Sequence, residues 1–458
     1  MKLSKVLIDR DLFEEITFTE GISTYNSTGS VNKTFNQCTF QNSFELRSYS
    51  GKMIFNSCFF EDSISTRTLF ESNNLFVKFT NCVFNAKIEI IRLKQLEFEN
   101  CKTNSEIKFG DHFSDNLIIS GGKFNELEFG RFNHDNRTKI ELNNIACKKL
   151  NFHGLNPKVI TICGGHFEKI FLDQIKYNES LKIEGNFEDQ TKVNIEFLSL
   201  RNNSFENSVL VKFASINNLD LSNSILRKND FQFQNVVFKS EVLAIESNLS
   251  GLQFNNVSFL DAKLFFDWSY LAETKFSNII WSKNNEVKSI LEKKANSSII
   301  EILRSKTEVY RQLKKASIDS NNQIDKLKFQ RNELDSYWKR VKIDKTESRT
   351  NRFLLRIDRL FSNFGQDYLR PIGWLLGVQL ILCCVIWWRE DVFHHYNAVS
   401  CSRGFEDGLA QYVSMIIPIF KTPEYWTGTS LTLSVIIRLF NALQIYHFIR
   451  AVHKFGKN

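Results

Sequence analysis

Phe35-Asn36-Gln37-Cys38-Thr39-Phe40 is the most informative segment of the chain, because the same phrase returns many times after it. It recurs as Phe55-Asn56-Ser57-Cys58-Phe59-Phe60 and as Phe79-Thr80-Asn81-Cys82-Val83-Phe84, and looser copies continue as far as Phe254–Phe259. The closing positions of these copies lie 19–24 residues apart, or about twice that. A steady period of this size is the signature of a repeat architecture in which each unit packs on its neighbours.

The local pattern within each repeat alternates apolar and polar residues and is interrupted by Asn or Gly pairs. This pattern predicts short strands joined by tight turns, and a repeat of about twenty residues leaves no room for a helix. We therefore expect a mainly β fold, a parallel right-handed β-helix (a solenoid), over residues 20–280, preceded by an N-terminal cap over 1–19. Phe and Cys should stack inside the coils, and Asn side chains should form ladders at the bends. A leucine-rich repeat is the nearest alternative architecture.

Four cysteines, Cys38, Cys58, Cys82 and Cys101, fall at one per coil. A stacked metal or disulfide site is one interpretation, and small buried hydrophobic side chains in an internal stack are the other. We favour the second, because a free Cys is among the most buried residue types. No CxxC pair suggests zinc. We expect neither a metal nor a cofactor.

The repeat region shows no recognisable catalytic centre. Its histidines, His112, His134, His153 and His166, are scattered, and no paired Asp or Glu recurs at a spacing that would place both on one face. Sugar-cleaving β-helices need clustered carboxylates. We expect that the chain is not an enzyme, and a carbohydrate-active β-helix is kept as a third alternative.

Charge divides the chain into two parts. Residues 1–280 hold 31 Lys and Arg against 34 Asp and Glu, whereas residues 281–458 hold 28 against 17, a net charge of +11. A basic region beside apolar segments points first to a membrane surface and second to nucleic acid. Nucleic acid is the weaker choice, because the excess lies outside the repeats. The start, MKLSKVLIDRDLFEE, does not read as a secretory signal, which predicts a cytosolic repeat region.

Helical periodicity replaces the alternation from residue 284 onward and predicts a helical connector over 284–348. Residues 349–370 form a basic amphipathic segment whose Arg352, Arg356 and Arg359 share one face. Such a helix lies in a lipid interface with its arginines near anionic head groups. Packing against the connector is the alternative.

Two segments of the membrane domain predicted over 371–458 are candidates for transmembrane helices. The first, 371–388, is uncharged after Pro371 and ends in Trp387 and Trp388, which suit the far lipid interface. Gly373 and Gly377 form a small-xxx-small pair that lets a second helix pack closely. A buried helix of a soluble protein is the alternative.

The second span, 431–449, carries Ser434, Arg438, Asn441 and Gln444 on one side. An Arg near the middle of a membrane is unfavourable unless it faces protein, water or a counter-charge. Lining of an aqueous pore built by several chains is one interpretation, and a polar contact between two anchoring helices is the other. Basic residues flank both spans on the same side, so the positive-inside rule predicts a multi-pass protein of the bacterial inner membrane with both termini cytoplasmic.

The repeat phrase resembles that of degenerate pentapeptide-repeat and related right-handed β-helix proteins of bacteria. Residues 365–376 (GQDYLRPIGWLL) and 445–456 (IYHFIRAVHKFG) resemble the edges of a two-span, ion-channel-like region in those proteins. The resemblance implies a cytosolic sensor or binding module coupled to an oligomeric two-span pore that permeabilises or depolarises the membrane, as in stress or phage-defence effectors. Its partners would be the lipid bilayer, further copies of the chain, and an unidentified protein or trigger on the β-helix. The alternative is a non-conducting, membrane-tethered protein-binding scaffold.

Overall fold

The computed structural model describes most of the chain between residues 11 and 455, in two compact units. The units comprise Met1–Phe329 and Gln330–Asn458, and each is described by itself. Outside the described residues lie 1–10, 24–30, 47–49, 67–73, 91–92, 111–115, 131–137, 154–157, 174–179, 186–191, 206–207, 227–230, 345–347, 365–366, 368, 390–427 and 456–458.

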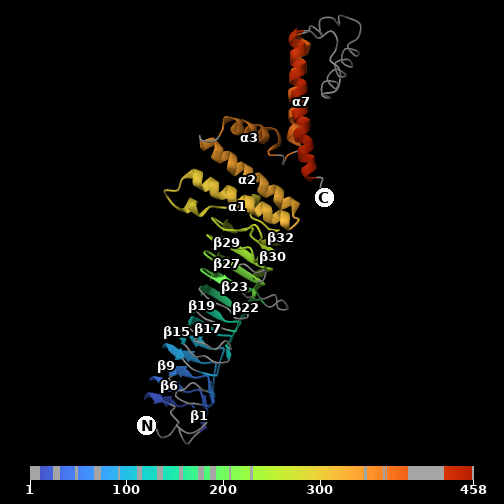
Figure 1. The fold of residues 1–458 in the computed structure, drawn as a ribbon. Coiled ribbons are helices and arrows are strands. Elements are labelled where there is room, and N and C mark those ends of the chain that lie inside the picture. The colour runs from blue at the N-terminus through green and yellow to red at the C-terminus, as the bar shows by residue number, and fades with distance from the viewer. Residues whose placement is uncertain are drawn as a thin grey trace. The chain divides into compact units, whose positions relative to one another are not determined.

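The first unit is a parallel β-solenoid, as predicted. Each early coil contains three strands, and each strand pairs in parallel with its equivalent one coil later, with Phe35 opposite Phe55 and Phe55 opposite Phe79. Figure 1 shows these strands stacked from β1 to β32. No helix occurs among the described residues between these two strands, which rules out a leucine-rich repeat with a helix in each unit there.

The strands of the early coils are β1 (Leu12–Glu14), β2 (Thr17–Phe18), β3 (Ile22–Ser23), β4 (Val31–Asn36), β5 (Thr39–Phe40), β6 (Phe44–Leu46), β7 (Ser50–Asn56), β8 (Phe59–Phe60), β9 (Ile64–Thr66), β10 (Asn74–Thr80), β11 (Val83–Phe84), β12 (Ile88–Ile90), β13 (Gln95–Glu99), β14 (Lys102–Thr103), β15 (Glu106–Phe109) and β16 (Asn116–Ser120). The strands thus begin within the segment predicted as a cap.

From β17 onward most coils contain two longer strands. β17 (Lys123–Phe129) pairs with both β14 and β15, so two short faces of the early coils continue as one bent strand. The remaining strands are β18 (Lys139–Asn143), β19 (Ala146–His153), β20 (Val159–Cys163), β21 (His166–Asp173), β22 (Ser180–Glu184), β23 (Val193–Ser199), β24 (Ser204–Phe205), β25 (Ser208–Lys212), β26 (Ala214–Asp220), β27 (Ile225–Leu226), β28 (Phe231–Gln234), β29 (Val237–Leu243), β30 (Leu252–Ser258), β31 (Lys263–Phe265) and β32 (Lys275–Ile280).

Stacked phenylalanine rings fill the centre of the early coils. The Phe55 ring lies 4.8 Å from that of Phe35 and 4.9 Å from that of Phe79, with the rings nearly parallel. A second column contains Phe18, Phe40, Phe60 and Phe84, whose successive ring centres are 4.6–5.0 Å apart. These separations match the spacing of neighbouring strands, because equivalent side chains repeat once per coil. The high Phe content is therefore a property of the interior.

Asn and Gly occupy the bends because the backbone there is left-handed. One residue per coil has φ between +51° and +67° in the row Gln37, Ser57, Asn81, Asn100, Gly121, Asn144 and Gly164. Asn and Gly tolerate this conformation better than other residues. Directly before this row, the Asn56 amide donates to Asn36 Oδ1 at 2.9 Å. In later coils Asn256 and Asn278 are themselves left-handed, and Asn278 donates to Asn256 Oδ1 at 2.8 Å. The predicted Asn ladder is confirmed in these coils.

The four repeat cysteines are buried, free thiols rather than disulfides. Cys58 Sγ donates to the Phe35 carbonyl oxygen at 3.3 Å, and Cys82 Sγ donates to that of Phe55 at 3.3 Å, so each thiol reaches back to the preceding coil. The prediction of small buried side chains is confirmed. Burial raises the pKa of the Cys147 thiol, in a later coil, from 9.0 to about 12.

We expect these thiols to resist a water-soluble disulfide reagent at about pH 8 in the folded chain and to react fully in denaturant, because all of them are buried and the reagent cannot reach them. Raising the pH should also weaken the fold. Cys147 stays neutral to a higher pH in the folded chain than in the unfolded chain. Its contribution to the free energy of unfolding is therefore fully present below pH 9.0 and is lost progressively as the pH rises toward 12. Titration of the thiols with a chromogenic disulfide measures the first effect. Rapid labelling of all these cysteines in the folded chain would contradict the buried stack.

Two helices close the C-terminal end of the solenoid. α1 (Ile299–Asp319) contacts β32, and the first residues of α2 (Gln323–Ile343) belong to the same unit. The Trp281 ring meets the buried Phe329 edge-on at 5.0 Å, and its Nε1 donates to Asp325 Oδ2 at 2.8 Å. The predicted connector therefore begins by covering the open core. Two 3₁₀ turns, η1 (Lys283–Asn285) and η2 (Ile290–Lys293), precede α1.

The second unit contains the rest of α2 with α3 (Arg349–Ser362), α4 (Leu369–Arg389) and α7 (Gly428–Phe455). α4 packs along α7, and α3 contacts both. The predicted spans thus form helices, but none of the helices in the described part of the chain is long and apolar enough to cross a membrane. The crossing itself stays a prediction.

Candidate functional site

On helix α7 of the second unit, polar side chains are buried and large apolar side chains are exposed. On α7, Asn441, Gln444 and His447 are buried, with exposed fractions of 0, 1 and 4%. The opposite side exposes large apolar side chains, among them Leu439 at 68% and Ile449 at 58%. A helix of a water-soluble monomer usually shows the reverse arrangement. The exposed apolar surface therefore needs lipid or protein to cover it.

Asp358 of α3 joins the polar end of this buried stripe. Its Oδ1 lies 3.1 Å from Arg450 Nη1 and 3.6 Å from His447 Nδ1, both on α7. The Phe361 ring packs against the His447 and Phe440 rings, with centres 6.1 Å and 5.7 Å apart. α3 is therefore fixed on α7 by one acidic side chain and one aromatic side chain.

The residues predicted to line a pore differ in how deeply the structure buries them. Asn441 and Gln444 lie buried within a single chain, Arg438 is half-buried, and the Ser434 side chain lies outside the described residues. Neither Gln444 Nε2 nor Gln444 Oε1 has a hydrogen-bond partner among the described atoms. A buried amide without partners is unfavourable by about 1–3 kcal/mol, so Gln444 lowers the stability of this helix packing unless a further polar group reaches it.

Gly373 and Gly377 do not mediate contacts within the described part of the chain. Both are exposed, and a Cβ atom added to either would meet nothing within 4 Å there. Their predicted role in helix packing could thus be fulfilled only by another chain or another segment. The side chains of Trp387 and Trp388 lie outside the described residues.

The predicted interfacial helix corresponds to α3. Arg356 and Arg359 are exposed beside the exposed apolar side chains of Phe353 and Leu354, whereas Arg352 is half-buried. Arg359 also forms an ion pair of 3.4 Å with Asp335 of α2. The helix thus combines the predicted amphipathic surface with contacts to its neighbours, including the connector.

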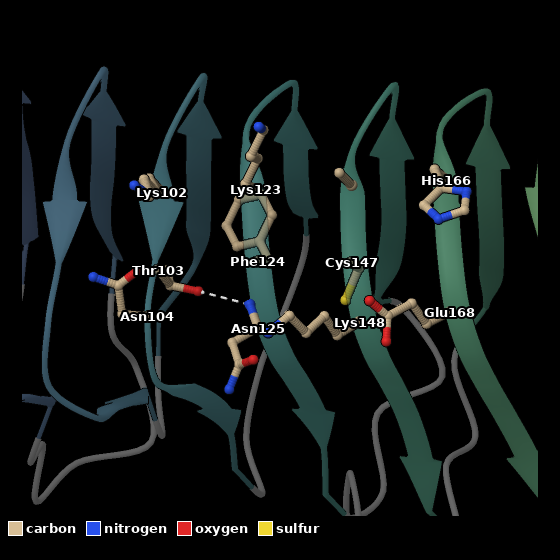
Figure 2. A pocket seen from close by; sticks show the side chains of 11 residues that line it. Lys102, Thr103, Asn104, Lys123, Phe124, Asn125, Cys147, Lys148, His166 and Glu168 are labelled. Atoms are coloured by element: carbon tan, nitrogen blue, oxygen red, sulfur yellow. Dashed lines mark hydrogen bonds between the residues drawn. The ribbon is translucent and has the colours of Figure 1, made fainter.

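A hollow on the solenoid is a second candidate site, which the sequence patterns did not predict. It has a volume of about 380 Å³ and crosses four successive strands, β14, β17, β19 and β21. Figure 2 shows its side chains in two rows, with Lys102, Lys123 and His166 in one and Asn104, Asn125, Lys148 and Glu168 in the other. Recurrence of Lys at the same repeat position was the signal that could have revealed it.

One group of carboxylates in the described part of the solenoid lies close enough to share a metal ion: Glu106, Glu126 and Glu128. Each already has a lysine partner, Lys87 at 3.1 Å, Lys149 at 2.5 Å and Lys108 at 3.2 Å, respectively. The arrangement is a ladder of ion pairs between coils, and it provides no argument for a metal.

No family model, curated protein or solved structure matches this chain. The parallel solenoid rests on the strand ladders alone. The resemblance to pentapeptide-repeat proteins and the right-handed sense of the coil stay predictions.

Proposed function

We propose that the chain is a non-enzymatic, membrane-anchored binding module, in which the β-solenoid binds a partner and α3, α4 and α7 attach it to a bilayer. The observation that carries this proposal is the inverted α7 helix, whose polar side chains are buried and whose apolar side chains are exposed. α4 adds exposed Leu380 and Ile381. The apolar run of α4 continues in the sequence to Trp388, beyond the side chains that the structure describes. Anchoring in a bacterial inner membrane, with the solenoid cytosolic, follows from the charge distribution.

Flotation with vesicles of phosphatidylcholine and phosphatidylglycerol tests the anchoring. The full chain should float with the vesicles, and Leu380→Lys combined with Leu439→Lys should reduce its partition by about 100-fold or more, since a buried Lys in a membrane costs about 2.5–3.5 kcal/mol. The matched control is Leu260→Lys with Ile280→Lys, two exposed apolar residues of the solenoid, which should float normally. A wild-type chain that stays with the unbound protein would contradict the anchor.

A second candidate function is an oligomeric pore, favoured by the unsatisfied amide of Gln444 and by the half-buried Arg438 on the same helix. In that case wild-type protein in vesicles should release a trapped dye, and Arg438→Leu or Gln444→Leu should change the release. A tethered scaffold predicts floating vesicles that retain the dye with all three proteins. The two functions are thus distinguished by the same preparation.

A further inference from the structure

Lysines lie on three successive strands of the solenoid near one small residue, Ala146. Lys102 lies opposite Lys123, Lys123 opposite Ala146, and Ala146 opposite His166 on successive strands. Neighbouring strands are about 4.8 Å apart, so the backbones of Lys123 and His166 lie about 10 Å apart, with Ala146 between them. The short side chain of Ala146 leaves the space between them open. Figure 2 shows Lys123 and His166 on the strands to either side of the one that carries Cys147 and Lys148.

The second row lies two residues further along each strand and therefore on the same outer face. It places Lys148 beside the gap above Ala146, with Asn125 and Glu168 on the flanking strands. The intervening residues, Phe124 and Cys147, are 3% exposed and form part of the core, so they fix the outward direction of both rows.

The lysines of the hollow lack the ion pairs that neighbouring lysines of the solenoid form. Lys149, next to Lys148, pairs with Glu126 at 2.5 Å, and Lys108 pairs with Glu128 at 3.2 Å. Among the residues that the structure describes, Lys102, Lys123 and Lys148 form no ion pair. Three Lys against Glu168 give the lining a net charge of +2 with His166 neutral. An anion that enters the hollow gains a favourable electrostatic interaction with these lysines.

From these observations we propose that the hollow over Ala146 binds a soluble ligand carrying two or three adjacent phosphate groups. A ligand with several negative charges within a few ångströms suits lysines carried by three successive strands beside one small gap, and the volume lies within the range of small-molecule sites. Asn104 and Asn125 add amide donors for phosphate oxygens.

Two other ligand classes fit the hollow less well. An extended acidic peptide is a poorer match, because its alternate carboxylates are single charges about 6.6 Å apart. Among the lining residues only the His166 ring is exposed, and Phe124 is buried, so there is no row of rings on which successive nucleobases could stack and single-stranded nucleic acid is also disfavoured. The inference does not depend on membrane anchoring.

Calorimetry with inorganic tripolyphosphate and the full chain in detergent tests the site. We expect saturable binding that weakens as salt rises from about 50 to 300 mM. Lys123→Gln with Lys148→Gln should weaken binding by about tenfold per lysine, since a charged hydrogen bond contributes about 1.5 kcal/mol. Ala146→Gln fills the gap without changing charge and should also weaken it. The matched control, Lys239→Gln with Lys263→Gln, removes the same charge from exposed solenoid positions outside the hollow and should bind normally.

Each result supports or overturns the proposal. Equal binding by the Lys123→Gln, Lys148→Gln variant of the hollow and by the control variant would show non-specific charge attraction and overturn the proposal. Absence of binding by the wild-type chain would do the same. Tighter binding of a poly-glutamate peptide or of a mixed-sequence DNA oligonucleotide than of tripolyphosphate would overturn the ligand class. Normal thermal unfolding of the variants shows that a loss of binding is not a loss of folding.

Discussion

Replacing Phe55 by Ala is expected to lower the free energy of unfolding of the solenoid by about 3–5 kcal/mol. The Phe55 side chain is fully buried and stacks between the Phe35 and Phe79 rings. Its removal leaves a cavity that the fixed strand register cannot close, because the coils above and below are held by backbone hydrogen bonds. Urea unfolding followed by far-ultraviolet circular dichroism measures the effect.

Phe59→Ala is the matched control for this experiment. Phe59 belongs to the same coil and is half-buried on the outward side of β8. Its loss should lower stability by much less, on the order of 1 kcal/mol. Equal effects of the two substitutions would contradict a core built on the Phe stack.

Asp267→Ala is expected to detach α1 from the last coil and to lower stability by about 2–4 kcal/mol. The Asp267 carboxylate is fully buried and accepts hydrogen bonds from Ser289 Oγ and Ser305 Oγ, both at 2.5 Å. It also accepts one from the Ile290 backbone N–H at 2.8 Å. Removing the carboxylate leaves these donors buried without their acceptor. Hydrogen exchange should accelerate throughout α1, since Ser305 lies on that helix.

Two further variants separate the network from general effects at this end of the solenoid. Asp267→Asn keeps one carbonyl oxygen and should cost less than Asp267→Ala. Asp261→Ala removes an exposed carboxylate outside the network and should leave exchange in α1 unchanged. Unchanged exchange in α1 with Asp267→Ala would mean that the helix is held by its other contacts, among them the hydrogen bond from the Leu271 N–H to Gln312 Oε1, and not by this network.

The repeat phrase was sufficient to predict the solenoid because the length of one coil sets both the period of the repeat and the positions of its interior residues. One coil takes about twenty residues, so a Phe or Cys that must face the interior recurs at that interval, as Phe35, Phe55 and Phe79 do. The left-handed bend also leaves a local mark, since Asn and Gly are the residues that tolerate it. The Phe columns, the thiol stack and the Asn ladder were all predictable for this reason.

The helical segments were predicted from their periodicity, but their partners were not. The pattern put Arg438, Asn441 and Gln444 on one side of a helix without indicating what that side would contact. In the structure Asn441 and Gln444 are buried within the chain, and Asp358 of α3 pairs with Arg450 of α7, 92 residues away. Periodicity describes one helix at a time and contains no information about such a pairing.

The coil, its interior and the positions of the helices could all be read from the order of the residues, because these features depend on spacings within about twenty residues. Which lysines pair with a carboxylate, and which stay exposed around the gap at Ala146, could be learned only from the folded chain. That outcome depends on the register between strands, where a difference of one residue exchanges an ion pair for an open, positively charged hollow.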